Sequence, residues 1–247
     1  MKTLVAIPVY NEQTHLEGVL GEARRFADHI LAINDGSTDA TAAILARQRD
    51  IATITHHENL GYGRSIIDAF RYAGAHGYDW VITMDCDEQH DPAQIPAFLD
   101  AAARDDADIV SGSRYLCPDG VGDPPPPARR RINHTINALL QRVLGLRLTD
   151  SFCGFKAHRV TALRRLALRE PGYAFPMQFW VQCARHGLRI REIPVRRIYR
   201  DASRSFGGEL DDPDLRLQHY LRVFADALAA SGNPARGEPC CAMAPCS

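Results

Sequence analysis

The chain has 247 residues, of which 45% are hydrophobic and 24% are charged, and its 29 basic and 30 acidic residues give a formal charge of −1. This composition is typical of globular proteins and excludes a chain that is disordered throughout. A near-neutral chain offers no overall field to a polyanion, so we expect no nucleic-acid partner. The length fits one large domain, or one domain with an appended subdomain.

Two further features of the composition concern the cellular compartment. No apolar run approaches the roughly 18 residues of a spanning helix, and Met1 leads directly into a strand-like segment. We therefore expect a cytoplasmic protein without a transmembrane helix. The seven cysteines are odd in number and show no C-x-x-C pair, which indicates neither a disulfide framework nor a zinc site. Three of them lie in residues 232–247, for which we predict a flexible tail.

The first half of the chain alternates short β-branched runs with segments of helical period. Strands are expected over residues 3–8, 29–34, 51–56, 80–84 and 108–112. Helices are expected from Leu16, from Ser37 or Thr38 to about Gln48, over 61–76 and over 95–103. This alternation predicts an α/β fold: an open, mainly parallel twisted sheet with helices on both faces.

The rhythm changes after Arg114. Residues 118–127 include four consecutive prolines and are expected to form a loop. Then follow an apolar-striped helix over 132–144, a strand over 152–156, helices over 159–168 and 176–186, a strand over 188–195 and a helix over 212–229. We predict one domain over residues 1–231, with its two halves meeting near residue 115.

Polar clusters follow three of the expected strands, at residues 8–12, 34–37 and 85–90. In an open α/β sheet, ligands bind in the crevice beyond the carboxyl ends of the strands. Each cluster alone is compatible with a simple turn that caps the next helix. Because all three fall at the same edge of the predicted sheet, together they indicate a binding site.

The third cluster has the residue types of a divalent-metal site. Asp85 and Asp87 are two positions apart on extended chain, so both carboxylates can project to one side. Mg²⁺ or Mn²⁺ bound to a phosphate substrate needs few protein ligands, and Gln89 could add an amide oxygen. Such an ion would neutralise charge on a diphosphate leaving group. The alternatives are acidic helix caps before Pro92, and His90 in place of Gln89, although a histidine in a loop is more often solvated.

Several common catalytic motifs are missing from the sequence. There is no Gly-x-x-x-x-Gly-Lys-Ser/Thr loop, no Gly-x-Gly-x-x-Gly after the first strand, and no nucleophile elbow. An ATPase, a dinucleotide-dependent dehydrogenase and covalent catalysis are therefore not indicated. Gly61-Tyr62-Gly63 could let the backbone approach a phosphate, or it could be only a turn.

Five segments in order resemble the motif series of the family 2 glycosyltransferases, and most closely the dolichyl- or polyprenyl-phosphate mannose or glucose synthases. They are I-P-V-Y-N-E from Ile7, N-D-G-S-T-D-A-T from Asn34, N-L-G-Y-G from Asn59, M-D-C-D-E-Q-H from Met84 and S-G-S-R-Y from Ser111. The resemblance covers about residues 3–206. It implies the GT-A fold, which is Rossmann-like, together with a nucleoside-diphosphate sugar donor, a divalent ion and inversion of the anomeric centre.

The resemblance also implies roles for individual residues. On the donor side, Pro8, Tyr10 and Glu12 would line the nucleotide pocket. Asp35 would accept hydrogen bonds from the base. Asp85 and Asp87 would hold the metal and the diphosphate, and Gln89 would complete the metal shell. Arg114 would face the diphosphate or the acceptor phosphate. The basic cluster of Arg114, Arg200 and Arg204 suits an anionic acceptor. Residues 150–156 resemble the family's D-x-x-x-G-F-K segment near the acceptor site. The sequence departs from the family pattern at two places. Asn34 stands where the family usually has Asp. The late basic segment, residues 200–205, has Arg where the synthases commonly have Lys near a Ser.

The acceptor is the main open question at this point. A phosphate acceptor is already ionised at neutral pH, whereas a sugar hydroxyl needs a carboxylate to take its proton. Only Glu88 and Asp150 remain as candidates for such a base, so a polyprenyl phosphate is favoured, with GDP-mannose or UDP-glucose as donor. The alternatives are a family 2 enzyme that acts on a glycan hydroxyl and a non-catalytic nucleotide-sugar-binding protein, which would be expected to lack Asp85 or Asp87.

A lipid acceptor would bring the protein to a membrane surface. The triplet Arg129–Arg131 and the apolar stripe that follows it could lie at the inner face of the membrane as a peripheral contact. A helix that faces the protein core shows the same stripe, so both interpretations stay open.

Overall fold

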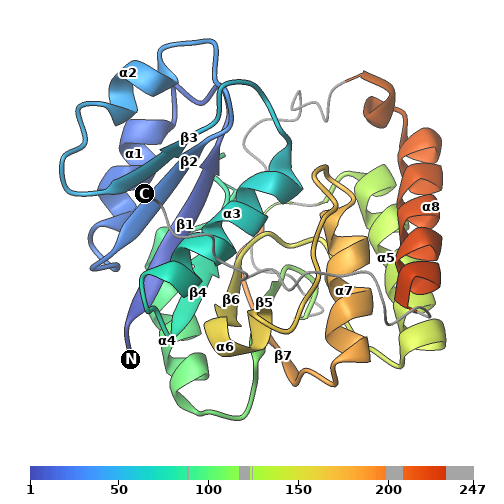
Figure 1. Cartoon of the computed structure of the whole chain (residues 1–247). Coiled ribbons are helices and arrows are strands. Elements are labelled where there is room, and N and C mark those ends of the chain that lie inside the picture. The colour runs from blue at the N-terminus through green and yellow to red at the C-terminus, as the bar shows by residue number, and fades with distance from the viewer. Residues whose placement is uncertain (88, 117–122, 124, 199–207, 232–247) are drawn as a thin grey trace.

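The computed structural model describes the chain except residues 88, 117–122, 124, 199–207 and 232–247. One seven-stranded sheet has the order β3-β2-β1-β4-β6-β5-β7 (Figure 1). Its strands are β1 (Thr3–Val9), β2 (Ile30–Asn34), β3 (Ala52–Thr55), β4 (Trp80–Thr83), β5 (Ile109–Ser113), β6 (Lys156–Arg159) and β7 (Ile190–Pro194). All neighbouring strands are parallel except β6, which is antiparallel to both β4 and β5. The predicted open, mainly parallel sheet is confirmed.

Strand β6 differs from its predicted position. Residues 152–155 are irregular, and the strand begins at Lys156, where Thr83 and Ser111 are its partners in the neighbouring strands. Because β6 runs against its neighbours, its first residue lies near the carboxyl ends of β4 and β5. The segment that enters β6 is thereby brought to the edge of the sheet where the polar clusters lie.

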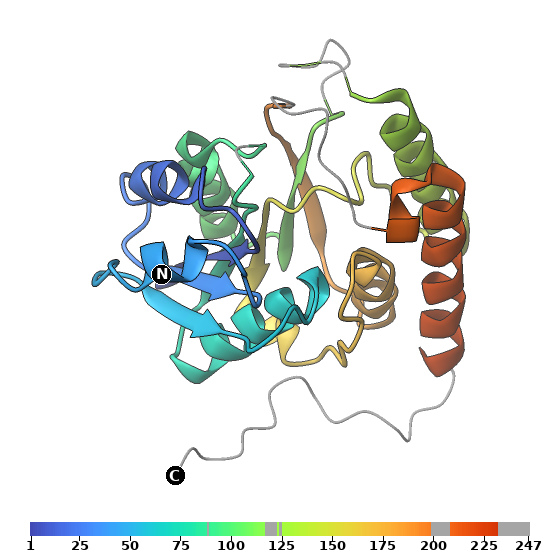
Figure 2. The same ribbon diagram turned by 90° about the horizontal axis from the view of Figure 1, so that it is seen from above.

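Helices cover both faces of the sheet, as predicted (Figure 2). Alternate residues of β1 enter different cores, with Leu4 and Ala6 on one face and Val5 and Ile7 on the other. On the Val5 face lie α1 (Leu16–Ala23), α2 (Thr41–Leu45) and α4 (Ile95–Ala103), preceded by the short helix η1 (Pro92–Gln94). On the Leu4 face lie α3 (Tyr62–Ala75), α5 (Pro127–Leu144), α6 (Val160–Leu163), α7 (Phe175–Arg185) and α8 (Pro213–Ser231), with η2 (Gly208–Asp211) before α8.

The start of α2 was predicted wrongly. The helix begins at Thr41 and has five residues, and neither Ser37 nor Thr38 caps it. Instead, Ser37 Oγ accepts the N–H of Asn11 at 3.0 Å, and the N–H of Thr38 donates to Asn11 Oδ1 at 2.8 Å. These residues therefore join the loop after β2 to the loop after β1. Helix α6 is likewise shorter than predicted and ends at Leu163.

The apolar stripe of α5 faces the protein core. Ile132, Ile136 and Leu140 are at most 3% exposed, whereas Val143 is 47% exposed. Helix α5 packs against α7 and α8, and Arg131 pairs with Asp214 of α8 at 2.7 Å. Of the two interpretations of this stripe, the structure supports the core-facing one. Within the described residues, no helix has both the length and the apolar character needed to cross a membrane.

Candidate active site

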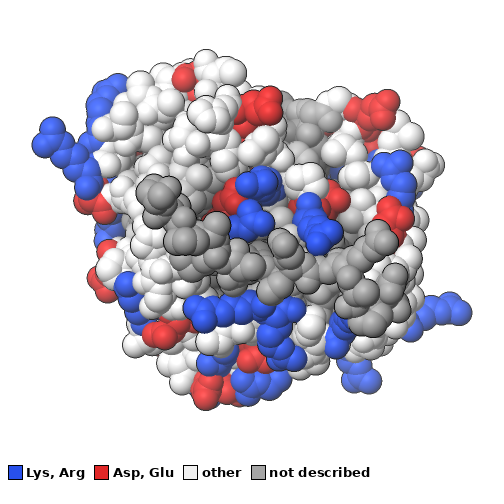
Figure 3. Space-filling model, in the orientation of Figure 1, with Lys and Arg blue, Asp and Glu red and all other residues white. Residues whose placement is uncertain are grey.

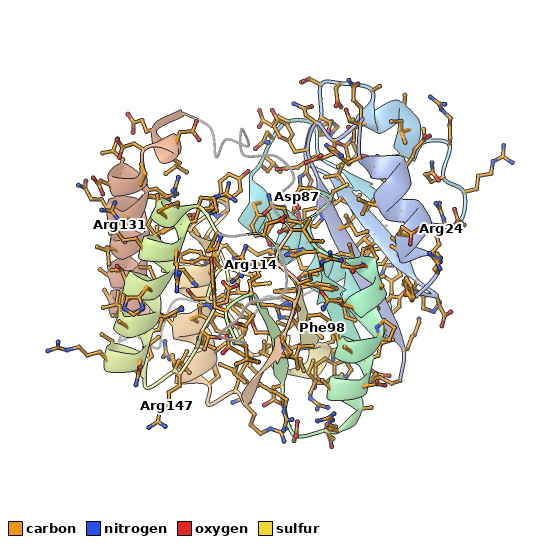
Figure 4. All side chains as sticks on the ribbon, turned by 180° about the vertical axis from the view of Figure 1, so that it is seen from behind. Arg24, Asp87, Phe98, Arg114, Arg131 and Arg147 are labelled. Carbon is orange, nitrogen blue, oxygen red and sulfur yellow. The ribbon has the colours of Figure 1, made fainter. Side chains whose placement is uncertain are left out.

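A cleft of about 540 Å³ lies at the carboxyl ends of β1, β2 and β4. It is lined by all the predicted site residues that the structure describes, namely Pro8, Tyr10, Glu12, Asp35, Asp85, Asp87, Gln89 and Arg114. Figure 4 shows Asp87 and Arg114 near one another in the middle of the molecule, with Arg131 on the outer helices. Arg200, Arg204 and Glu88 lie outside the described residues.

The loops after β1 and β2 are bonded to each other. Besides the contacts of Asn11, the N–H of Glu12 donates to Thr41 Oγ1 at 3.0 Å. Asn34 Oδ1 accepts the N–H of Ser37 at 3.0 Å, a role that an aspartate oxygen can also serve. The departure from Asp at position 34 therefore leaves this turn intact.

The Asp35 carboxylate is held by hydrogen bonds from within the chain. The side chain is buried, and Oδ1 lies 2.6 Å from His56 Nδ1 and accepts the N–H of Leu60 at 2.9 Å. Oδ2 accepts the N–H of Gly61, also at 2.9 Å. On its other side, His56 Nε2 lies 3.1 Å from Asp68 Oδ2. Sequence reasoning missed His56 because it stands at the end of β3, outside every motif.

The Gly-Tyr-Gly segment allows a close approach, but of protein backbone. Gly61 has φ +100°, and a Cβ there would lie 2.4 Å from the carbonyl oxygen of Pro171. A Cβ on Gly63 would lie 2.3 Å from the carbonyl oxygen of Glu170. The N-terminus of α3 is thus packed against residues 170–172, and the ring of Tyr62 stacks on Tyr173 with centroids 6.0 Å apart.

Asp85, Asp87 and Gln89 take part in short-range hydrogen bonds. Asp87 Oδ1 accepts the N–H of Gln89 at 3.1 Å, and the N–H of Asp85 donates to His90 Nδ1 at 2.9 Å. Gly154 closes the other side, because a Cβ there would lie 2.6 Å from Asp85 Oδ2. Burial and the negative charge of Asp85 raise the pKa of Tyr62 well above its usual value, so this phenol stays protonated beside the carboxylate.

His90 is neither solvated nor placed as a metal ligand. It is 4% exposed, and burial lowers its pKa to about 4, so the ring is neutral at physiological pH. Its Nδ1 is the atom that accepts the Asp85 N–H, which leaves the proton on Nε2. The expectation of a solvated loop histidine was therefore wrong. The sequence indicates the loop, but it does not show that Phe155 packs against the His90 ring.

The described residues fit a metal ion that is shared with a substrate. They contain no group of three or more His, Cys, Asp or Glu side chains able to hold an ion by themselves. Asp85 and Asp87 are both partly exposed in the cleft, and Gln89 lines it beside them. One or two carboxylates completed by substrate phosphates is the usual set for Mg²⁺ in such sites. The residues therefore suit a divalent ion that arrives with a diphosphate.

Arg114 is held by a buried carboxylate. Its Nε and Nη2 donate to the two oxygens of Asp150 at 2.7 and 3.0 Å, and its backbone N–H donates to Asp150 as well. Asp150 is fully buried, and its own N–H donates to Glu192 Oε1 of β7 at 3.0 Å. Burial acts to raise the pKa of Asp150, but the charge and hydrogen bonds of Arg114 outweigh it and hold the pKa below its usual value. Asp150 is thus a structural partner and not an accessible base.

Two more buried groups lie at the floor of the cleft. Lys156 donates through Nζ to the carbonyl oxygen of Cys153 and lies 5.5 Å from the ring of Trp180. Burial lowers the pKa of Lys156 and raises the pKa of the Cys153 thiol to about 11. Cys153 is therefore a protonated thiol at neutral pH, in line with the absence of a nucleophile motif.

The charged side chains that line the cleft are separated by sign along the chain. Among the described lining residues, the carboxylates are Glu12, Asp35, Asp85 and Asp87, and the lysine and arginine residues are Arg114, Arg129, Lys156 and Arg216. Sequence reasoning missed Arg216, which lies on α8 one turn before Tyr220, another lining residue. Figure 3 shows acidic and basic side chains close together near the centre of one face, so the near-neutral total conceals local charge of both signs.

The fold matches solved glycosyltransferase structures. Glucosyl-3-phosphoglycerate synthase from Mycobacterium tuberculosis, crystallised with Mn²⁺, UDP and glucosyl-3-phosphoglycerate, superposes with a TM-score of 0.68 at 20% identity, over 94% of this chain and 81% of that one. The seven-stranded sheet with the acidic turn at its edge is therefore the GT-A fold of glycosyltransferases.

Comparison of sequences identifies the family. The model of glycosyl transferase family 2 matches residues 4–167. The undecaprenyl-phosphate mannosyltransferase of Micrococcus luteus is 33% identical over 214 residues, which are 83% of this chain and 87% of that protein. The polyprenol monophosphomannose synthase of Mycolicibacterium smegmatis is 29% identical over 204 residues, 78% and 76% of the two chains. The chain belongs to glycosyl transferase family 2, as its motifs predicted, and is a glycosyltransferase.

Proposed function

We propose that this chain transfers a hexosyl unit from a nucleoside-diphosphate sugar to the phosphate of a polyprenyl or dolichyl lipid, with inversion at the anomeric carbon. The observation that carries the proposal is that the described lining of the cleft holds charge of both signs: carboxylates at residues 12–87 and cations at residues 114–216. The carboxylates suit a metal-bound diphosphate, and the cations suit an anionic acceptor. The names of the two bacterial relatives support the same acceptor class and mannose as the sugar.

On the donor side, residues 1–115 would bind the nucleotide sugar, either GDP-mannose or UDP-glucose. Pro8, Tyr10 and Glu12 would line the nucleotide pocket, and Asp35 would accept hydrogen bonds from the base. Asp85, Asp87 and Gln89 would hold Mg²⁺ or Mn²⁺. When bound, this ion supplies positive charge that stabilises the departing diphosphate.

On the acceptor side, residues 116–231 would bind the lipid phosphate. Arg129 and Arg216 line the cleft, and so does Arg114, which is paired with Asp150. An acceptor phosphate is ionised at neutral pH, so its oxygen can attack the anomeric carbon while the bond to the diphosphate breaks, with no proton to remove. This chemistry suits the described lining residues beyond residue 113, whose charged side chains are arginines and a lysine and include no carboxylate. We propose that Arg200 and Arg204, beyond the described residues, add to the same charge.

A polyprenyl phosphate is anchored in a membrane, so this function requires the protein to work at a membrane surface. We propose peripheral contact from the cytoplasmic side. The buried stripe of α5 is not available for this contact, since Ile132, Ile136 and Leu140 are in the core.

A transfer assay with two matched acceptors tests the proposal. The protein is incubated with Mn²⁺, radiolabelled GDP-mannose or UDP-glucose, and either a short polyprenyl phosphate or the corresponding polyprenol. We expect label to enter the organic phase with the phosphate and not with the alcohol, because the alcohol needs a base to remove its proton. Failure of every donor with the lipid phosphate would refute the proposal, and transfer to a glycan hydroxyl instead would establish the alternative acceptor.

Replacement of the acceptor-side arginines locates the phosphate site. Arg129→Gln and Arg216→Gln should each raise the KM for polyprenyl phosphate by roughly 10-fold, because each removes a charge-assisted contact. The KM for the nucleotide sugar should change little. An equal rise in both KM values would contradict the assignment of the two sides. Arg131→Gln is the matched control, because Arg131 lies on α5 like Arg129 but pairs with Asp214 at the surface.

A further inference from the structure

His90 connects the two segments that enclose Asp85. Its Nδ1 accepts the Asp85 N–H at 2.9 Å, and its Nε2 lies 3.9 Å from Cys153 Sγ. The ring is also packed on Phe155, with centroids 5.2 Å apart. One buried side chain, which does not line the cleft, therefore contacts both the acidic turn and the segment that enters β6.

Asp85 has little freedom to adopt another position. Behind it, its N–H is bonded to His90, and in front of it Gly154 leaves no space, since even a Cβ would approach Asp85 Oδ2 to 2.6 Å. If the His90 acceptor were removed, the N–H of Asp85 would have to reorient to find a partner. Such a rotation of the backbone would carry the Asp85 carboxylate with it and would shift the turn that continues to Asp87.

We propose that His90 is a positioning residue that fixes the segment carrying Asp85 and Asp87 through the hydrogen bond from Asp85 N–H to His90 Nδ1. It thereby sets where the two carboxylates meet a divalent ion and a diphosphate. His90 touches neither of these groups and acts only through Asp85. The inference rests on the proposed function, because it presumes that Asp85 and Asp87 bind the metal-diphosphate group.

Two nearly isosteric variants separate this role from simple core packing. In His90→Asn, the amide oxygen can occupy the place of Nδ1 and accept the Asp85 N–H. In His90→Gln, the oxygen extends toward the place of Nε2, so the acceptor is lost although the side chain stays polar and fills more of the space. Phe98→Leu is the stability control, because Phe98 stacks on Phe155 from the same core with centroids 4.3 Å apart but does not line the cleft (Figure 4).

The first measurement is made on the protein without metal. Hydrogen exchange of the Asp85 amide should be as slow in His90→Asn as in the original protein, and roughly 10-fold faster in His90→Gln, which lacks the acceptor. Phe98→Leu should lower the thermal midpoint without a selective change at this amide. Equal protection of the Asp85 amide in the Asn and Gln variants would overturn the inference, whether or not the protein is a transferase.

The second measurement is the binding of Mn²⁺ in the presence of GDP or UDP, followed by electron paramagnetic resonance. His90→Asn should retain the affinity within about threefold, and His90→Gln should lose roughly 10-fold, as for an unpaired buried N–H. If the original protein binds Mn²⁺ and both variants bind it equally well, the positioning role is wrong. If the original protein binds no Mn²⁺ with either nucleotide, the proposed function fails, and the inference fails with it.

Discussion

The two sides of the cleft hold their charged side chains in different ways. In residues 1–115, the loops that carry the motifs are bonded to each other, as Asn11 is to Ser37 and Thr38. Arg114, at the boundary of the two halves, is held instead by a residue from a distant segment. Asp150 holds Arg114 from 36 residues away, and Glu192 holds Asp150 from a further 42.

This difference explains why one side is visible in the sequence and the other is not. A motif loop needs several specific residues close together, because its hydrogen bonds run within it or to the next motif loop. An ion pair across the fold needs only one residue at each end, and any Asp or Arg can supply it. Variants on both sides test whether this contrast holds.

The largest effect is expected on the donor side. Asp87→Ala should lower kcat/KM by a factor on the order of 10³, because it removes a group that would hold the ion stabilising the leaving group. The measurement is the initial rate of sugar transfer with Mn²⁺ varied. Asp106→Ala is the control, since Asp106 pairs with Arg191 and neither residue lines the cleft. Unchanged metal-dependent turnover in Asp87→Ala would remove Asp87 from the site.

The next effect concerns the buried pair of Arg114 and Asp150. Asp150→Ala should lower the free energy of unfolding by about 3–5 kcal/mol, because it leaves the partly buried guanidinium without its partner. The double variant Arg114→Met, Asp150→Leu should recover most of that stability but not the transfer activity. Urea denaturation measures the first quantity. A loss below about 1 kcal/mol in Asp150→Ala would mean that this side does not depend on the long-range pair.

Gly154 tests the contact between the two sides. Gly154→Ala should weaken Mn²⁺ binding and destabilise the fold by about 1–3 kcal/mol, because the added Cβ collides with Asp85 Oδ2. Gly21→Ala is the matched control: nothing lies within 4 Å of its Cβ position in α1, so it should stabilise the protein by about 0.5–1 kcal/mol. Equal behaviour of the two alanine variants would show that Asp85 moves freely.

The smallest effect is a dependence of stability on pH. The folded pKa of Asp150 lies below its unfolded value of about 3.9, so its pair with Arg114 contributes stability above that pH. The contribution is lost as the pH falls through the folded pKa. Unfolding of the original protein, compared with the Arg114→Met, Asp150→Leu variant between pH 6 and pH 2, should show the original losing its advantage on acidification. A constant difference across this range would contradict the assignment.

Much of the first side was predictable from local pattern. The helix over 95–103 was predicted to the residue, and the strands were placed within one or two residues, because alternating apolar runs report burial directly. The prediction failed at Ser37, where a good capping residue serves a different loop. The preference of Ser37 for capping a helix is overridden there by its hydrogen bond to Asn11 in another loop.

The sequence by itself determined the fold class, the acidic turn and the family, since each depends on residues that lie close together in the chain. Only the tertiary structure decided that His90 is buried, that Asp150 holds Arg114 and that Arg216 reaches the cleft. It also placed β6 antiparallel between β4 and β5, which carries Gly154 to Asp85. These outcomes depend on which distant segments meet, and burial then sets protonation and pairing, which no local pattern of residues encodes.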